Sequence, residues 1–254
     1  MPRKRSPSAA ESLPALREAL LSRSERGAFA AATVSCGAEL DRAWPQGGLR
    51  RGSLVEWLGE TEGCGWGTFA FAAACQATAE GGALAIVDRE GTFFPPAAAA
   101  LGIDLTEIVV VRPASDREAL WAFDQALRCP AVSVVWGRVE SLPGRAYRRL
   151  QLSAEEGGTI GFLLRSTRTL SQPSWCDFAV GVRALPTGGD LRYRLEIMRS
   201  RDGITGRSAD FEIDDDGRIR TSDSHDENAL HLVSAVDDSA SPRRSERTGD
   251  EKSA

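Results

Sequence analysis

Short runs of apolar, often β-branched residues alternate through the middle of this chain with segments of about ten residues that suit a helix. Such runs are typical of strands that are buried on both faces of a sheet. Their alternation with helices implies βαβ units, and therefore an α/β fold with a mostly parallel central sheet. The predicted strands are Leu54–Leu58, Ala83–Asp88, Ile108–Val111, Ala131–Trp136 and Thr159–Leu164.

The segments between these strands have helical composition and helical start and stop signals, such as Pro at the first turn and Gly after the last. The predicted helices are Phe69–Glu80, Pro95–Gly102, Asp116–Arg128 and Ala146–Glu156. After Pro173 the pattern changes to short segments separated by polar turns, which is typical of antiparallel strands. These strands are predicted at Phe178–Ala184, Leu191–Met198 and Arg207–Ile213.

The composition along the chain predicts four regions. Residues 1–12 are small and polar, and we expect a flexible arm. Residues 13–34 are predicted as an N-terminal helix, because leucines recur at helical spacing between Leu13 and Leu21. Residues 35–215 form the predicted core domain. Residues 216–254 are rich in Asp, Ser, Arg and Glu, and are predicted to be a disordered tail.

Composition excludes several classes of protein. A formal net charge of −5 over 254 residues argues against a protein that coats nucleic acid by bulk charge. No run approaches the roughly 18 apolar residues of a membrane span, and we expect a cytoplasmic protein without a secretory leader. The five cysteines contain no CxxC pair, so reduced thiols are expected rather than a metal site. Only His225 and His231 are present, which argues against histidine-based catalysis.

A glycine-rich loop, Gly59–Thr68, follows the first predicted strand and precedes a helix. In this context a loop cradles phosphate groups with its backbone N–H groups. The working pattern GxxxxGK[ST] needs a Lys for the phosphates and a hydroxyl for Mg²⁺, but Trp66 and Gly67 occupy those places. The residues of this degenerate nucleotide site are Gly59, Gly63, Gly65, Gly67 and Thr68.

Three interpretations of the loop stay open: a purely structural turn, weak binding of ATP with Mg²⁺, and hydrolysis. The loss of a full positive charge beside polyphosphate favours the first, and no cofactor is expected. The acid that holds the Mg²⁺ water shell is also missing, because Trp136 and Gly137 end the fourth strand. Glu90 is the one candidate for a water-activating carboxylate, although such a residue is more often a cap or an ion-pair partner.

Three segments resemble the core of bacterial RecA. Glu39–Gly59 is similar to the stretch that leads into the RecA phosphate loop, and Asp88-Arg89-Glu90 is similar to the segment that bears the RecA catalytic glutamate. Leu101–Leu105 is similar to the segment before the third RecA strand. The resemblance covers roughly residues 35–215 and implies a RecA-like P-loop NTPase core.

Within that superfamily, Arg148–Arg165 resembles the signature of the ImuA group, also labelled SulA-like. This resemblance implies a non-catalytic accessory protein of SOS-induced translesion DNA synthesis. Such a protein contacts an ImuB-like protein and RecA, and acts indirectly with an error-prone DnaE-type polymerase. RecA-like proteins commonly self-associate, so a homo-oligomer is an expectation as well.

The segments that correspond to the RecA DNA-binding loops are short in this chain. We expect contacts with DNA or a partner from the arginines near them, or else a solvated helix face. These candidates are Arg138, Arg145, Arg148, Arg149, Arg165 and Arg168. Two alternative functions remain: a RecA-class ATPase that acts on DNA through Glu90 and the loop, and a SulA-like inhibitor of cell division.

Overall fold

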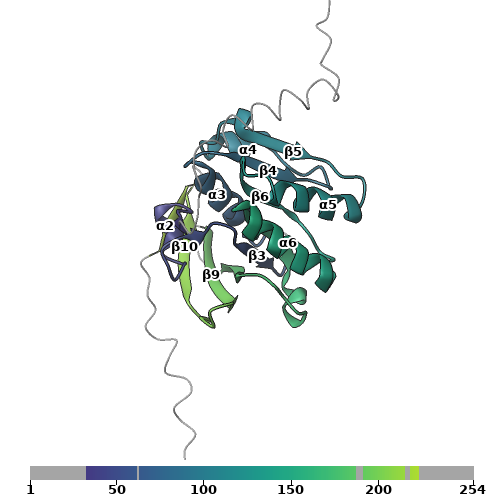
Figure 1. Cartoon of the computed structure of the whole chain (residues 1–254). Helices are drawn as coiled ribbons and strands as arrows, with labels where there is room; N and C mark the ends of the chain where they lie inside the picture. Colours follow the sequence, from purple (N-terminus) through teal and green to yellow (C-terminus); the bar gives the residue numbers. More distant parts are fainter. Residues whose placement is uncertain (1–32, 62, 187–190, 215–217, 223–254) are drawn as a thin grey trace, which may run out of the picture. The chain divides into compact units, whose positions relative to one another are not determined.

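The computed structural model describes residues 33–61, 63–186, 191–214 and 218–222 (Figure 1). These residues contain a nine-stranded sheet in the order β11-β10-β9-β8-β3-β7-β6-β4-β5. Its strands are β3 (Leu54–Gly59), β4 (Ala83–Val87), β5 (Ile108–Val111), β6 (Val132–Arg138), β7 (Ile160–Ser166), β8 (Phe178–Leu185), β9 (Leu191–Ser200), β10 (Ser208–Ile213) and β11 (Ile219–Thr221).

The pairing within the sheet divides it into two parts. Strands β3 to β7 pair in parallel, and β8 joins them by pairing in parallel with β3. From β8 onward, β9, β10 and β11 extend the sheet by antiparallel pairing. The predicted α/β fold, with a mostly parallel sheet and antiparallel strands on its C-terminal side, is therefore confirmed.

Helices cover both faces of the sheet. Helix α3 (Trp66–Thr78) lies on one face, as does the short α4 (Pro95–Ala100), while α5 (Asp116–Leu127) and α6 (Gly144–Gly157) lie side by side on the other (Figure 1). Because successive side chains of a strand point to opposite faces, β3 contributes residues to the core on each face of the sheet. Val55 and Trp57 join the core under α3, whereas Leu54 and Leu58 join the core under α5 and α6.

Two regional predictions need correction. Thr33–Val34, the end of the predicted N-terminal helix, form β1 and pair with β2 (Leu49–Arg50). Ile219–Thr221, inside the predicted tail, form β11 on β10, because the Thr221 backbone N–H donates to Glu39 at 3.0 Å and Ile219 packs on the core. The rest of the predicted arm and helix (1–32) and of the tail (223–254) lies outside the described residues.

Three short elements complete the described chain: α2 (Ala38–Asp41) and the 3₁₀ turns Leu105–Glu107 and Thr167–Ser171. No helix among the described residues is both long and apolar enough to cross a membrane.

A buried ion pair joins the middle of the sheet to the loops at its edge. Glu56 of β3 and Arg165 of β7 are 3% and 1% exposed, and Arg165 Nη1 donates to Glu56 Oε1. The same guanidinium donates to the carbonyl oxygens of Val139 at 3.1 Å and Glu140 at 3.3 Å. It also donates to Gln172 Oε1 at 3.1 Å. Arg165 therefore ties β3 and β7 to the loops after β6 and after β7.

Small polar side chains complete the hydrogen bonding of Glu56. Ser174 Oγ donates to Glu56 Oε2 at 3.1 Å, and the Tyr147 hydroxyl lies 2.8 Å from Ser174 Oγ. Burial raises the pKa of the neighbouring Cys176 thiol to about 12, and the Glu56 carboxylate adds to this shift. Burial, with smaller contributions from Cys176 and Glu56, also raises the pKa of Tyr147. The neutral forms of both groups are thus favoured beside the single carboxylate.

We predict that Glu56→Gln lowers the free energy of unfolding by about 3–5 kcal/mol, because it leaves the buried Arg165 without its counter-charge. Urea denaturation followed by circular dichroism measures this change. The matched control is Glu212→Gln, which removes a half-exposed partner of Arg192 and should cost about 1 kcal/mol or less. Equal losses in the two variants would contradict the special weight of the buried pair.

Candidate functional site

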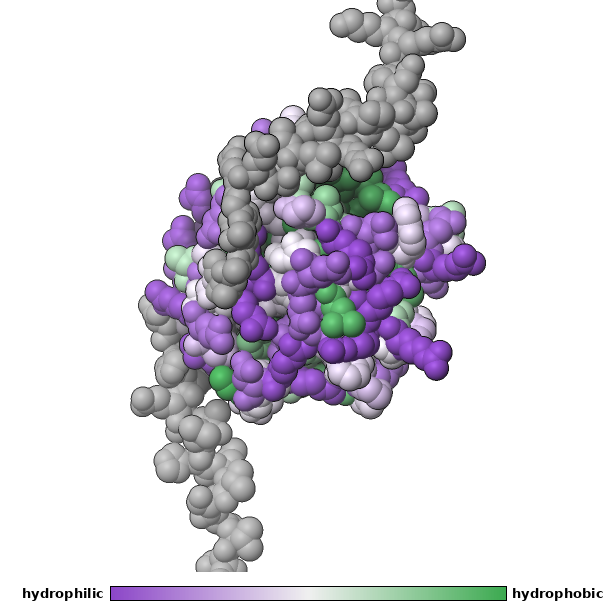
Figure 2. All heavy atoms as spheres, in the orientation of Figure 1, coloured by the Kyte–Doolittle hydropathy of each residue, from purple (hydrophilic) through white to green (hydrophobic). Residues whose placement is uncertain are grey.

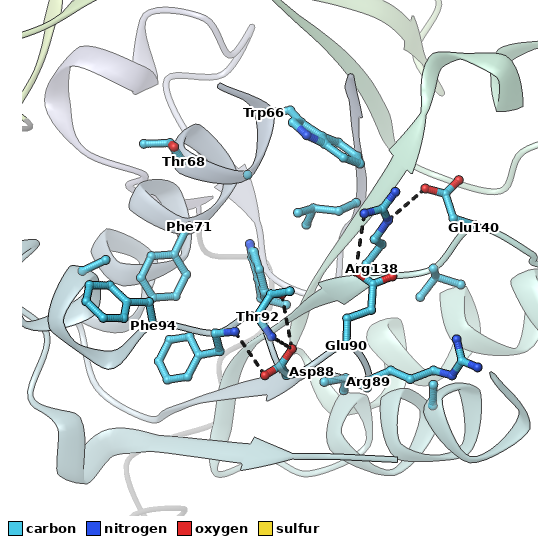
Figure 3. A pocket seen from close by; sticks show the side chains of 18 of the residues that line it. Trp66, Thr68, Phe71, Asp88, Arg89, Glu90, Thr92, Phe94, Arg138 and Glu140 are labelled. Carbon is cyan, nitrogen blue, oxygen red and sulfur yellow. Dashed lines mark hydrogen bonds and ion pairs between the residues drawn. The ribbon is translucent and has the colours of Figure 1, made fainter. Parts of the chain in front are cut away.

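A cavity of about 570 Å³ lies where β4 and β6 end and α3 begins (Figure 3). Because β3, β4, β6 and β7 run in parallel, the loops that follow them meet at this one edge of the sheet. Ligands of open α/β sheets bind in crevices at this edge. The predicted glycine-rich loop and the predicted Glu90 both belong to it.

The loop after β3 is filled by its own side chains. A Cβ atom added to Gly59 would lie 2.7 Å from Cγ of Trp66 and 2.7 Å from Sγ of Cys64, so the indole and the thiol lie directly against this glycine. Trp66 is the first residue of α3 and is only 8% exposed. The residue that replaces the phosphate-binding Lys therefore points back into the loop and packs there.

The other predicted loop residues have separate positions. Gly65 caps α3 with a φ of 88°, and a Cβ atom there would lie 2.6 Å from the Tyr193 ring, so both the turn and the packing require glycine. Gly63, Gly67 and Thr68 line the cavity. The structure thus places three of the five predicted residues at the cavity wall, and keeps Gly59 and Gly65 for packing.

The position of the missing second acid is also occupied by packing. A Cβ atom added to Gly137 would lie 2.5 Å from the Val87 carbonyl oxygen and 3.1 Å from Phe123, so β6 touches β4 too closely for a carboxylate side chain. Trp136, the residue before it, lines the cavity instead. The residues present at Trp66 and Gly137 do not fit an Mg²⁺–ATP complex, since neither charged group that such a complex needs is there.

Asp88 is the buried carboxylate at the end of β4, and its hydrogen bonds hold a turn. It is 4% exposed and accepts from the backbone N–H of Thr92 at 2.9 Å and of Phe93 at 3.1 Å. Arg112 Nε lies 3.9 Å from the same carboxylate. These contacts fix the chain from Asp88 to Phe93, which bears Glu90 at the cavity.

Glu90, the predicted catalytic candidate, lies in an ion-pair chain (Figure 3). Arg138 Nη1 is 3.5 Å from Glu90, and Arg138 Nε is 3.1 Å from Glu140. The guanidinium carbon lies 5.7 Å from the centre of the Trp66 ring. Glu90 is therefore a partner of Arg138 beside a filled loop, and its role as a water-activating base stays a prediction.

An aromatic wall forms the other side of the cavity. Phe71 packs against Phe93 at 5.9 Å and against Trp136 at 5.6 Å between ring centres. Phe94 and Trp66 line the same cavity. Sequence reasoning missed this wall, although aromatic residues after β4 and at the end of β6, both at the functional edge of the sheet, were a visible signal.

The six predicted arginines do not form one surface. Arg165 is buried and bound inside the protein, so the predicted contact of this residue with DNA or a partner is wrong. Arg138 lines the cavity, and Arg149 Nε lies 3.3 Å from Asp124. Arg148 stacks over Trp175, with its guanidinium carbon 4.9 Å from the ring centre. The two that remain, Arg145 and Arg168, are exposed.

A second groove, of about 580 Å³, adjoins Arg148 and Trp175 on the side of α6. It is lined by Gln151, Glu155, Ser174, Cys176, Arg199, Ser200 and Arg201 as well. Within the described ranges, no group of three or more His, Cys, Asp or Glu side chains is arranged to hold a metal ion.

The fold and the cavity together define an α/β protein with a candidate site at the carboxyl ends of its parallel strands. The phosphate-type loop beside this site is filled by the side chains of Trp66 and Cys64. The RecA N-terminal domain family matches residues 17–148, just over half of the 254 residues. The chain belongs to the RecA family.

Individual relatives agree with this assignment. Protein RecA of Chlorobium limicola is 40% identical over 96 residues, which cover 38% of this chain and 27% of that protein. Protein RecA of Rhizobium rhizogenes is 28% identical over 215 residues, covering 71% of this chain and 58% of that protein. The chain therefore spans about a quarter to three fifths of the length of these RecA proteins. A crystal structure of the RadB recombinase has the same fold, with a TM-score of 0.59, 19% identity, and coverage of 73% of this chain and 98% of that one.

We predict that Gly59→Ala lowers the free energy of unfolding by about 1–3 kcal/mol, because the added methyl group overlaps Trp66 and Cys64. In a background with Trp66→Ala and Cys64→Ala the same substitution should cost less than about 0.5 kcal/mol. Thermal unfolding of the four proteins completes the cycle. An equal cost in both backgrounds would show that the indole and the thiol do not fill the loop.

Proposed function

We propose that this protein is a non-catalytic, RecA-like accessory protein of SOS-induced translesion DNA synthesis. It acts through contacts with an ImuB-like protein and with RecA, and through them on an error-prone DnaE-type polymerase. The observation that supports this proposal above all is Trp66, which takes the place of the phosphate-binding Lys and packs against Gly59.

The energetic argument concerns the charges that phosphoryl transfer needs. Two unit charges at 4 Å interact by about 4 kcal/mol at an effective dielectric constant of 20, so one missing Lys removes a large part of the affinity for polyphosphate. Catalysis of this reaction depends almost wholly on positioning and charge stabilisation. A domain without the Lys and without an acid at Gly137 retains the RecA-like fold but lacks the charges that phosphoryl transfer needs. Its surface can still bind other proteins.

The resemblance of Arg148–Arg165 to the ImuA signature supports the translesion role. That segment forms all but the first four residues of α6 and all but the last residue of β7. The exposed part of α6 brings Arg148 next to Trp175, so the signature contributes to a surface as well as to the core. This surface is one that a partner or DNA can reach.

The experiment for the accessory role uses the purified full chain with the ImuB-like protein and the RecA of its own organism. We expect binding to at least one of them at micromolar protein, and loss of damage-induced mutagenesis when the gene is deleted. As a control, Trp121→Ala changes an exposed tryptophan on α5, away from the glycine-rich loop, and should bind these proteins as the wild type does. If neither protein binds and deletion leaves induced mutagenesis unchanged, the proposal fails.

We predict that the wild-type chain shows no binding of Mg²⁺–ATP tighter than about 1 mM, because the filled loop offers no cation to the phosphates. Isothermal titration calorimetry with the full chain measures this. A Kd below about 10 μM that Glu90→Ala abolishes would favour the ATPase alternative.

We further propose a weak contact with single-stranded DNA at Arg148 and Trp175. Trp175 is 43% exposed, and its ring carries the Arg148 guanidinium on one face. Arg199 and Arg201 line the adjoining groove. An aromatic ring beside several arginines is the combination that stacks bases and neutralises phosphates in single-strand binders.

We predict that Trp175→Ala weakens binding to an oligothymidine strand by at least about fivefold, since stacking on one aromatic ring contributes roughly 1–3 kcal/mol. Fluorescence anisotropy of a labelled strand at low salt measures the affinity. Trp121→Ala is the matched control, because Trp121 is 61% exposed but lies on α5. Equal effects of the two substitutions would contradict a contact at this surface.

A further inference from the structure

The cavity at the edge of the sheet is lined by aromatic residues and by more acidic than basic residues, and we call it the aromatic–acidic cavity. Its aromatic wall consists of Trp66, Phe71, Phe93, Phe94 and Trp136. Its charged residues are Asp88, Glu90, Asp116 and Glu140 on the acidic side, with Arg89 and Arg138 on the basic side. Four carboxylates against two guanidinium groups give the described lining a formal net charge of −2.

The carboxylates at the mouth of this cavity are accessible. The side chains of Glu90 and Glu140 are 47% and 42% exposed, and that of Asp116 is 71% exposed. Asp116 pairs with Arg89 at 3.2 Å, and Glu90 pairs with Arg138 at 3.5 Å. Ion pairs this exposed are weak, so an incoming cation can join or replace them at little cost.

An anionic ligand meets the opposite situation. Arg138 is already placed between Glu90 and Glu140 (Figure 3), and the Asp88 carboxylate is buried behind them. A phosphate or carboxylate group would have to break both ion pairs of Arg138 and then lie beside the released carboxylates. The charge of the cavity therefore favours a cation and disfavours an anion.

The aromatic wall adds the second requirement. Phe94 stands at the N-terminus of α4 and is 64% exposed, although it lines a cavity whose deeper wall contains the packed rings of Phe71 and Trp136. An exposed ring in a cavity that also contains carboxylates offers its face to a guanidinium or ammonium group that enters the cavity. The packed rings offer apolar surface to a neighbouring side chain.

The dimensions and the surroundings point to a peptide side chain as the occupant. A volume of about 570 Å³ lies within the usual range for small-ligand sites and holds one large side chain with its neighbour. The face of the molecule in Figure 2 is mostly hydrophilic, with hydrophobic residues in small separate patches. A concave aromatic cavity is a natural anchor for one residue of a partner.

We propose that the aromatic–acidic cavity binds an Arg or Lys side chain that a partner protein presents next to an apolar residue. The cation pairs with Glu90 and Asp116 and stacks on Phe94, while the apolar neighbour packs on the Phe71 side. This inference rests on the proposed accessory function, to which it adds the docking site and the chemistry of the partner segment. The proposed ligand at this edge of the sheet is therefore a cation, whereas a nucleotide is an anion.

The test uses the full chain, labelled with ¹⁵N, and three blocked dipeptide amides as probes. N-acetyl-Phe-Arg-amide should shift amide resonances of residues 88–94 and the indole N–H of Trp66 or Trp136 in two-dimensional NMR. N-acetyl-Phe-citrulline-amide has nearly the same shape without the charge and should bind at least about threefold more weakly. N-acetyl-Phe-Asp-amide should cause no shifts at these residues. Higher ionic strength should weaken the Arg probe.

Two variants place the binding in the cavity. Glu90→Gln and Phe94→Ala alter exposed side chains, so the fold should persist, and each should weaken the Arg probe by about threefold or more. Asp202→Asn, an equivalent charge change in the turn after β9, and Trp121→Ala are the controls and should leave its affinity unchanged. Unfolding temperatures measured beside each titration separate lost binding from lost structure.

Three results would overturn the inference: equal or tighter binding of the Asp probe, shifts of the same resonances by Mg²⁺–ATP, or no shift with the Arg probe at any concentration. Because these measurements use no partner protein, they are independent of the test of the accessory role. Binding of the ImuB-like protein or RecA that survives both Glu90→Gln and Phe94→Ala would leave the accessory function standing and remove the cavity from it.

Discussion

The ion pair between Glu56 and Arg165 is the contact on which both candidate surfaces depend. Burial of two charges costs several kcal/mol, and a single exchanged hydrogen bond does not offset it. Arg165 meets this cost with further hydrogen bonds to Val139, Glu140 and Gln172. Val139 and Glu140 line the aromatic–acidic cavity, and the segment after Gln172 leads to Trp175. One guanidinium group thus sets the position of the loops at two separate surfaces.

The strands could be predicted from the sequence because each is a short run of apolar, often β-branched residues bounded by turn signals. Ile108–Val111 is identical in prediction and structure, and the other predicted strands end within two residues of the observed ones. The strands β1 and β11 were missed since they are two and three residues long, too short for a pattern to identify. A contact with a residue distant in the sequence adds to the local pairing of β11 with β10. Glu39, for example, binds Thr221 across most of the chain. Local composition contains no trace of such a contact.

The position of the candidate site could be predicted from the sequence, but the packing and pairing of its side chains could not. Glycine spacing identified the loop after β3, but the direction of the Trp66 ring follows from its packing on Gly59, which no pattern encodes. Arg165 was interpreted as a surface cation because its counter-charge is 109 residues away. The glycines of the ImuA-like signature have a structural explanation as well. A Cβ atom at Gly161 would lie 2.3 Å from Leu54, so part of that signature reports packing rather than partners.

The changes at the loop and at β6 are physically coupled. A Lys in place of Trp66 would lose its function without an acid near Gly137 to hold the metal, and an acid at Gly137 has no room beside Val87. In this structure Arg138 pairs with both Glu90 and Glu140. A bound anion would lie beside these two carboxylates and be repelled by them. The described lining of this edge has four carboxylates and two guanidinium groups, which give it a formal net charge of −2. A fold can therefore keep its binding edge and exchange the class of ligand, because the position of the edge depends on strand order and its charge depends on a few side chains.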